Sequence, residues 1–110
     1  MNKISKQIKL TKFIKFEVKA GKQVKARAFL YVIKNGLHKQ PYGLLEDLFV
    51  EEKYRGEGLG KALLLRVIQE AKKRKLYKLI GTSRKEREAV HSMYLKYGFK
   101  NYGYEFRMEL

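Results

Sequence analysis

The chain has no cysteine and no tryptophan, and its one proline is Pro41. Without cysteine it has no disulfide, no thiolate metal ligand and no cysteine nucleophile. No apolar run approaches the ~18 residues that a membrane-spanning helix needs, and the beginning of the chain lacks the apolar core of a secretory signal. The two histidines, His38 and His91, are not spaced as a metal-binding pair. We therefore expect a cytoplasmic protein with no membrane segment and no metal site.

Acidic residues are also scarce. The chain has 11 Asp and Glu against 26 Lys and Arg, for a formal net charge of +15, and Glu17 is the single acid in residues 1–40. Such a field attracts polyanions, including nucleic acid and coenzyme A. Lysine outnumbers arginine, however, and readout of base edges favours arginine. The composition therefore predicts nonspecific affinity for nucleic acid rather than recognition of a sequence.

The order of apolar patterns predicts one domain over residues 1–110, because no repeat or linker interrupts them. Alternating apolar residues predict strands at about 7–19, 24–33, 44–50, 77–82 and 104–110. Apolar residues at helical spacing predict helices at about 58–75 and 86–97. The order β-β-β-α-β-α-β indicates an α/β (α+β) fold, in which two main helices pack on a mixed, mainly antiparallel sheet.

A glycine-rich loop lies between the third strand and the first helix, with glycine at positions 56, 58 and 60. Glycine lets the main chain approach a ligand closely, and a helix start offers free N–H groups to an anion. The P-loop pattern G-x-x-x-x-G-K-[ST] fails, because its first position holds Arg55 and its last Ala62. The dinucleotide spacing G-x-G-x-x-G is not met either. The loop therefore predicts a different phosphate site, with a plain glycine turn as the alternative.

Two motifs resemble those of one family. Arg55, Gly58 and Gly60 form an Arg-x-x-Gly-x-Gly pattern similar to the pyrophosphate-binding motif of the GNAT superfamily, the acyl-CoA-dependent N-acetyltransferases. Downstream, the run from Met93 to Phe99 resembles the superfamily's Tyr-x-x-x-Gly-Phe helix end. The resemblance covers roughly residues 24–110 and implies a GNAT-like domain that uses acetyl-CoA as co-substrate. The usual first strand and pair of helices are missing or reduced to the residues before about Phe13.

The resemblance also implies residue roles. Backbone amides of the glycine loop would bind the pyrophosphate of CoA, and the preceding strand would pair with the pantetheine arm. Arg87 stands where many members have an asparagine, and its cation would approach a CoA phosphate. The cofactor-binding residues are then Leu48, Phe49, Val50, Arg55, Gly56, Glu57, Gly58, Leu59, Gly60, Lys61 and Arg87.

Three side chains are candidates for catalysis. Tyr94 matches the tyrosine that protonates the leaving thiolate in many members, and a phenol can supply that proton. Glu46 corresponds to a glutamate near the acceptor that acts as base, and Asp47 is the alternative, because the family's strand is bulged here. The competing interpretation is that Tyr94 only packs on the sheet and that both carboxylates are solvated.

The leading functional hypothesis is transfer of an acetyl group from acetyl-CoA to a primary amine by direct attack in a ternary complex. With neither a cysteine nor a nucleophilic serine elbow, an acetyl-enzyme is disfavoured. The acceptor side is open or completed by a second subunit in a homodimer, which favours an amine on a protein or peptide. Two alternatives remain, a non-catalytic acetyl-CoA-binding regulator and a basic module associated with nucleic acid.

Overall fold

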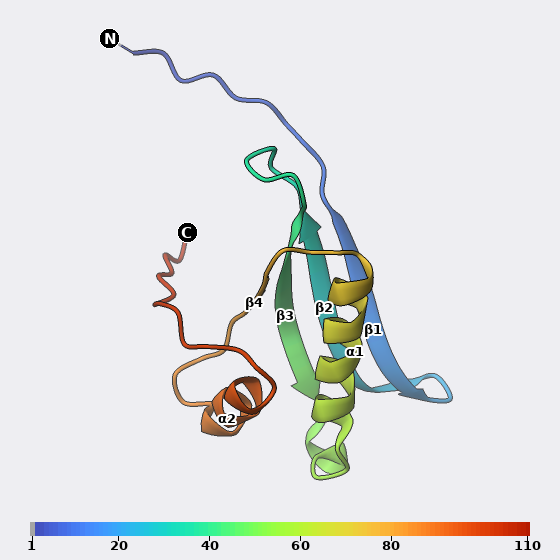
Figure 1. Cartoon of the computed structure of the whole chain (residues 1–110). Helices are drawn as coiled ribbons and strands as arrows, with labels where there is room; N and C mark the ends of the chain where they lie inside the picture. Colours follow the sequence, from blue (N-terminus) through green and yellow to red (C-terminus); the bar gives the residue numbers. More distant parts are fainter. Residues whose placement is uncertain (1) are drawn as a thin grey trace.

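The computed structural model describes residues 2–110, whose sheet has four strands in the order β1-β2-β3-β4 (Figure 1). Strands β1 (Lys12–Ala20), β2 (Gln23–Ile33) and β3 (Tyr42–Val50) are antiparallel neighbours, and β4 (Leu79–Gly81) runs parallel to β3. Between β3 and β4 come a short 3-10 helix, η1 (Glu52–Tyr54), and α1 (Leu59–Lys73); α2 (Glu88–Lys96) follows β4. The mixed, mainly antiparallel sheet with two main helices confirms the predicted fold class.

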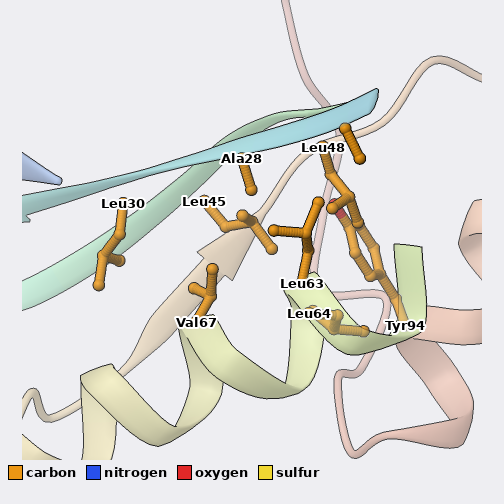
Figure 2. Packing of buried hydrophobic residues seen from close by; sticks show 9 residues of the cluster. Ala28, Leu30, Leu45, Leu48, Leu63, Leu64, Val67 and Tyr94 are labelled. Carbon is orange, nitrogen blue, oxygen red and sulfur yellow. The ribbon is translucent and has the colours of Figure 1, made fainter. Parts of the chain in front are cut away.

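Helix α1 packs across one face of the sheet, and the core lies between the two (Figures 1 and 2). The buried stripe of α1 includes Leu64 and Val67, both with no exposed surface, as the helical spacing predicts. Small residues of β2 face this stripe, so the helix lies close to the strand. The buried cluster consists of Ala26, Ala28, Leu30, Leu45, Leu48, Leu63, Leu64, Val67 and Tyr94. Tyr94 comes from α2, so α2 is fixed to the same core as α1.

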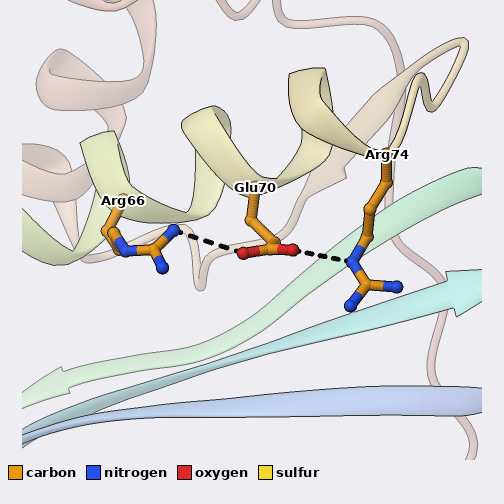
Figure 3. A network of polar contacts seen from close by, with 3 residues as sticks. All are labelled: Arg66, Glu70 and Arg74. Atoms are coloured by element: carbon orange, nitrogen blue, oxygen red, sulfur yellow. Dashed lines mark hydrogen bonds and ion pairs between the residues drawn. The ribbon is translucent and has the colours of Figure 1, made fainter.

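A chain of ion pairs runs along the side of α1 that faces the strands (Figure 3), and the Glu70 side chain at its centre is only 12% exposed. Glu70 accepts from Arg66 Nη1 at 3.2 Å and from Arg74 Nε at 2.8 Å, each one helical turn away. These i, i+4 pairs support the helix. The hydrogen bond from Arg74 is the main reason that the pKa of Glu70 lies below its ordinary value of 4.5.

The first strand is shorter than the sequence predicts. Strand pairing begins at Lys12, which lies opposite Val32, and β2 ends one residue later at Ile33. Residues 7–11 therefore have no neighbouring strand to continue the ladder. Ile8 and Leu10 are exposed, although their alternation suggested a half-buried strand.

The prediction of a closing strand at residues 104–110 is wrong, because residues 99–110 have no regular secondary structure. The available edge beside them belongs to β4, which is only three residues long. A strand is stabilised by pairing and by packing of one face, and the segment has neither here. The observed order of strands and main helices along the chain is therefore β-β-β-α-β-α.

Candidate active site

A groove forms because β3 and β4 pair over only part of their length. The parallel ladder joins residues 43–45 of β3 to residues 79–81 of β4 and then stops. Just beyond it β3 is bulged: Arg27 lies opposite Phe49 and Phe29 opposite Glu46, so the register shifts between them. Asp47, in the bulge, has a φ of +52°. The far half of β3 thus diverges from β4 and leaves room between β3 and α2.

The space between β3 and α2 contains two adjoining cavities of about 390 and 350 Å³. Leu48, Arg87 and Val90 line both cavities, so together they form one groove. The larger cavity lies toward the hydroxyl end of Tyr94, and the smaller one reaches the start of α1. The larger is lined by Glu46, Asp47, Leu48, Thr82, Ser83, Arg84, Arg87, Val90, Tyr94, Glu105 and Arg107. The smaller is lined by Leu48, Val50, Arg55, Gly60, Glu86, Arg87, Glu88, Ala89, Val90 and Met93.

The glycine loop leaves helix N–H groups without partners at one end of this groove. Gly58 caps α1 in the left-handed conformation, with a φ of +82°, and no side chain of residues 2–110 caps the helix. The first bond of the helix ladder runs from the Ala62 amide to the Gly58 carbonyl at 3.0 Å. The three amides before Ala62 are therefore available to an anion, and they lie at the positive end of the helix dipole.

Arg55 fixes this loop to the strand that precedes it. Its Nε donates a hydrogen bond to the Val50 carbonyl at 2.9 Å, and its guanidinium lies 5.5 Å from the centre of the Phe49 ring. The loop is thereby held against the end of β3, and the remaining guanidinium N–H groups stay free to meet an anion in the smaller cavity. An acyl-CoA would find free amides for its phosphates here and an unpaired strand edge for its amide-containing arm.

Tyr94 lies at the other end of the groove and is only 8% exposed. Its ring stacks on Phe99 with centroids 4.9 Å apart, and its hydroxyl donates to the Thr82 carbonyl at 3.3 Å. Gly81 allows this packing, because a Cβ there would lie 3.2 Å from both rings. Burial raises the pKa of Tyr94 above its ordinary value of 10.0, with the nearby Arg87 charge acting weakly in the opposite direction. The phenol is therefore protonated at neutral pH.

Both candidate bases lie on the wall of the larger cavity. Glu46 is half-buried and Asp47 is exposed. Consecutive strand residues normally point to opposite faces, but the bulge turns the backbone between them. Both carboxylates consequently line the cavity that contains Tyr94, and the choice that the sequence left open between them stays open.

A sequence comparison identifies the family. The model of the acetyltransferase (GNAT) domain matches residues 12–101. The chain belongs to the GNAT acetyltransferases. This match covers every strand and helix of the structure, and all residues that line the groove except Glu105 and Arg107 lie within it.

Relatives of this GNAT domain include one that is named for its substrate. A glucosamine 6-phosphate N-acetyltransferase from Trypanosoma brucei brucei is 35% identical over 68 residues, which make up 62% of this chain but only 44% of the relative. A solved acetyltransferase from Trypanosoma brucei matches with a TM-score of 0.78 and 26% identity, over 89% of this chain and 69% of that one. A structure from Clostridium acetobutylicum, described as a predicted acetyltransferase with acetyl-CoA, has a TM-score of 0.73 and 22% identity, over 88% and 64% of the two chains.

The GNAT groove brings together only some of the residues that the sequence singled out. Glu46, Asp47 and Tyr94 share the larger cavity, and Arg87 lies at its junction with the smaller one. Six predicted cofactor-binding residues line neither cavity with their atoms: Phe49, Gly56, Glu57, Gly58, Leu59 and Lys61. Glu57 instead pairs with Lys25 at 3.8 Å on the surface. Any contact from the glycines would come from their backbone.

Several residues of the larger cavity had no signal in the sequence. Arg84 lies in the loop before α2, and Glu105 and Arg107 lie in the segment after it. Their presence depends on how distant loops meet, so neither spacing nor residue type marks them. The Nε2 of His91 lies 2.7 Å from the Arg84 carbonyl and so ties this loop to α2.

Residues 2–110 contain neither a helix that could span a membrane nor a cluster of metal ligands. Neither helix there is long and apolar enough to cross a lipid bilayer. These residues also include no group of three His, Asp or Glu side chains placed to hold a metal ion.

Proposed function

We propose that this GNAT domain transfers an acetyl group from acetyl-CoA to a primary amine by direct attack. The observation that carries the proposal is a single groove that runs from Gly60, one of the three residues with free amides at the start of α1, to the protonated hydroxyl of Tyr94. The similar Clostridium acetobutylicum structure, described as containing acetyl-CoA, supports the choice of co-substrate.

In the proposed reaction the amine nitrogen attacks the thioester carbonyl, a C–N bond forms and the C–S bond breaks. Only a neutral amine can attack, so an acceptor that arrives as ammonium first gives a proton to Glu46 or Asp47, directly or through water. The leaving thiolate takes a proton from Tyr94, whose raised pKa keeps that proton available at neutral pH. The acylated nitrogen, cationic after the attack, gives its second proton to solvent; solvent then reprotonates the Tyr94 phenolate and takes the proton from the carboxylate.

The charges of the larger cavity support a small acceptor that carries both an amine and an anionic group. Three arginines, Arg84, Arg87 and Arg107, line it together with the carboxylates of Glu46, Asp47 and Glu105. Guanidinium groups suit phosphate, because their N–H groups match its oxygens. The Trypanosoma brucei brucei relative is named for glucosamine 6-phosphate, which has this combination of groups. We propose an amino sugar phosphate as the acceptor class, with an amine on a protein or peptide as the alternative.

The co-substrate is tested by calorimetry with acetyl-CoA and by following the release of the CoA thiol on addition of amines. Binding together with amine-dependent release supports an acetyltransferase. Binding with no release across a panel of amino sugar phosphates, polyamines, aminoglycosides and basic peptides would instead identify a non-catalytic acetyl-CoA binder. Absence of binding would reject both.

The acceptor class is tested with glucosamine 6-phosphate and glucosamine, which differ only in the phosphate. A charged hydrogen bond contributes roughly 1.5–3 kcal/mol, so losing it should lower kcat/KM about 10–100-fold for the sugar without phosphate. Arg84→Gln should reduce this preference, whereas Arg74→Gln, at the C-terminal end of α1 and outside both cavities, should leave it unchanged. Acetylation of a basic peptide with no activity on either sugar would reject the amino sugar phosphate.

A further inference from the structure

Most of the excess positive charge lies at one end of the molecule, which we call the basic end. It consists of residues 2–12, residues 34–42 leading from β2 into β3, and residues 72–78 at the end of α1 and just beyond. These segments hold 11 of the 26 Lys and Arg and none of the 11 Asp and Glu. All of these cations are exposed, and within residues 2–110 Arg74 is the only one of them with a carboxylate partner.

The fold brings the three segments together, away from the groove. Strand β1 begins beside the end of β2, where Lys12 pairs with Val32. The Tyr77 amide donates to the Pro41 carbonyl at 3.0 Å, which joins the segment after α1 to the loop before β3. Figure 1 shows this loop, the start of β1 and the end of α1 on the side opposite to the glycine loop. Because α1 has 15 residues, about 22 Å of helix separates the two ends.

Aromatic rings lie among these cations. The His38 ring packs on the Tyr77 ring with centroids 4.2 Å apart, and the Tyr42 ring meets Tyr77 edge-on at 6.1 Å. Lys78 Nζ lies 5.0 Å from the centre of the Tyr42 ring and 5.3 Å from that of Tyr77. Tyr77 is 39% exposed, and His38 is exposed as well. The basic end therefore combines accessible ring surface with positive charge.

Stabilisation of α1 explains only part of this charge. Lys72 and Lys73 lie in the last turn, where cations offset the negative end of the helix dipole. Lys34 and Lys39 lie on a separate loop, so the dipole does not account for them. Lys75 has a φ of +58°, a left-handed conformation that glycine usually supplies after a helix. Since glycine would adopt this φ without strain, folding of the helix end does not account for a lysine there.

We propose that the basic end binds single-stranded nucleic acid, with its lysines on the phosphates and the Tyr77 ring stacked on a base. Surfaces that bind single strands without sequence preference combine these two features, because every base has a ring face. A duplex presents its phosphates but hides the faces of its bases. Lysine binds phosphate as a point charge, so we expect little sequence preference. This proposal does not depend on the proposed function, because the groove lies at the other end of α1.

Binding is tested by fluorescence anisotropy with labelled oligouridylate and oligodeoxythymidylate of about 12 nucleotides, within the site size of such surfaces. At least one of the two should bind more tightly than a duplex of the same length, and the comparison between them identifies RNA or DNA as the better ligand. Tighter binding of the duplex, or no binding of either strand at low salt, would overturn the proposal. Binding to phosphatidylserine vesicles without affinity for the oligonucleotides would also overturn it, and would identify a membrane site instead.

Matched lysine substitutions test the location. Lys78→Gln should reduce the slope of log affinity against log salt concentration by about 0.7. Lys22→Gln, in the turn between β1 and β2 at the other end of the sheet, should leave the slope unchanged. Lys75→Gly should weaken binding without lowering the melting temperature, because glycine adopts the left-handed φ readily. Equal effects of Lys22→Gln and Lys78→Gln would assign the affinity to the overall charge and overturn the site.

The role of the ring is tested at Tyr77. Tyr77→Phe keeps the ring and should bind like the wild type, whereas Tyr77→Leu should lose about 5–100-fold in affinity, the contribution of one stacked base. Equal affinities of these two variants would overturn the stacking. Saturating acetyl-CoA should leave the affinity for the oligonucleotide nearly unchanged. Full displacement by acetyl-CoA would place the nucleic acid in the groove and overturn the basic end as its site.

Discussion

Replacing Tyr94 by phenylalanine tests the proton-donor role with little disturbance of the fold. Phenylalanine keeps the ring that stacks on Phe99 and fills the space beside Gly81. Only the hydroxyl is lost, and its one hydrogen bond, to the Thr82 carbonyl, is long at 3.3 Å. Such a bond contributes about 1 kcal/mol or less to stability. The melting temperature of Tyr94→Phe should therefore lie close to that of the wild type.

Turnover should fall much more than stability. A positioned general acid contributes about 10²–10⁴-fold to the rate, so we expect kcat to drop at least about 100-fold, or roughly 2.7 kcal/mol in activation free energy. The affinity for acetyl-CoA should stay constant, because the phosphate end of the groove is untouched. Tyr97→Phe is the control, since Tyr97 is on the same helix but lines neither cavity. A kcat for Tyr94→Phe within about threefold of the wild type would refute the proton-donor role.

The same variant has a signature in stability against pH. Burial raises the pKa of Tyr94 in the folded state above its ordinary value of 10.0. The stabilisation linked to this shift is complete below pH 10 and is lost as the pH rises through the higher folded value. Below pH 10 the wild type and Tyr94→Phe should thus differ by a constant free energy of unfolding. Above it the wild type should lose this stability and the variant should not, as measured by urea unfolding at each pH.

Three other substitutions test the core, the glycine loop and the ion pairs along α1. Leu64→Ala, at a site with no exposed surface, should lower the free energy of unfolding by about 2–5 kcal/mol. Leu65→Ala, at a 41% exposed site, should lower it far less. Equal losses in urea unfolding would contradict the burial of Leu64 in the core. Gly58→Val and Gly36→Val both place a branched residue at a φ of +82° and should both lower stability, but only Gly58→Val should abolish calorimetric binding of acetyl-CoA. Glu70→Gln should lower the melting temperature at pH 7, and the difference should disappear as the pH falls below 4.5 and through the lowered pKa of Glu70; a difference independent of pH would contradict the role of its ion pairs.

Local signals predicted most of the fold. The alternation in β2 and the helical spacing of Leu64 and Val67 identify the two faces that meet in the core. The succession of a strand, three glycines and a helix predicts the loop at the proposed phosphate end of the groove, because glycine readily adopts the left-handed φ that Gly58 has. These elements are encoded by neighbouring residues, and the structure contains them within one or two residues of the predicted bounds.

The wrong or missing predictions concern segments whose structure depends on contacts with a distant part of the chain. Alternation at residues 104–110 correctly describes a strand-like pattern, but a pattern does not supply a neighbouring strand. Residues 7–11 do not form the predicted strand for the same reason, since β2 ends before it can pair with them. Arg84 and Arg107 could not be predicted as cavity residues, because their proximity results from how two loops meet around α2.

The two halves of the groove therefore differ in what determines them. The proposed phosphate end depends on backbone features, namely free amides, a left-handed glycine and an open strand edge, which would offer the same contacts to any acyl-CoA. The acceptor end depends on side chains from β3, α2, the loop between β4 and α2, and the C-terminal segment. Three cations and three carboxylates balance there, in contrast to the net charge of +15 for the chain. The overall field can speed the arrival of an anionic co-substrate, but selection of the acceptor must come from the positions of these six charges.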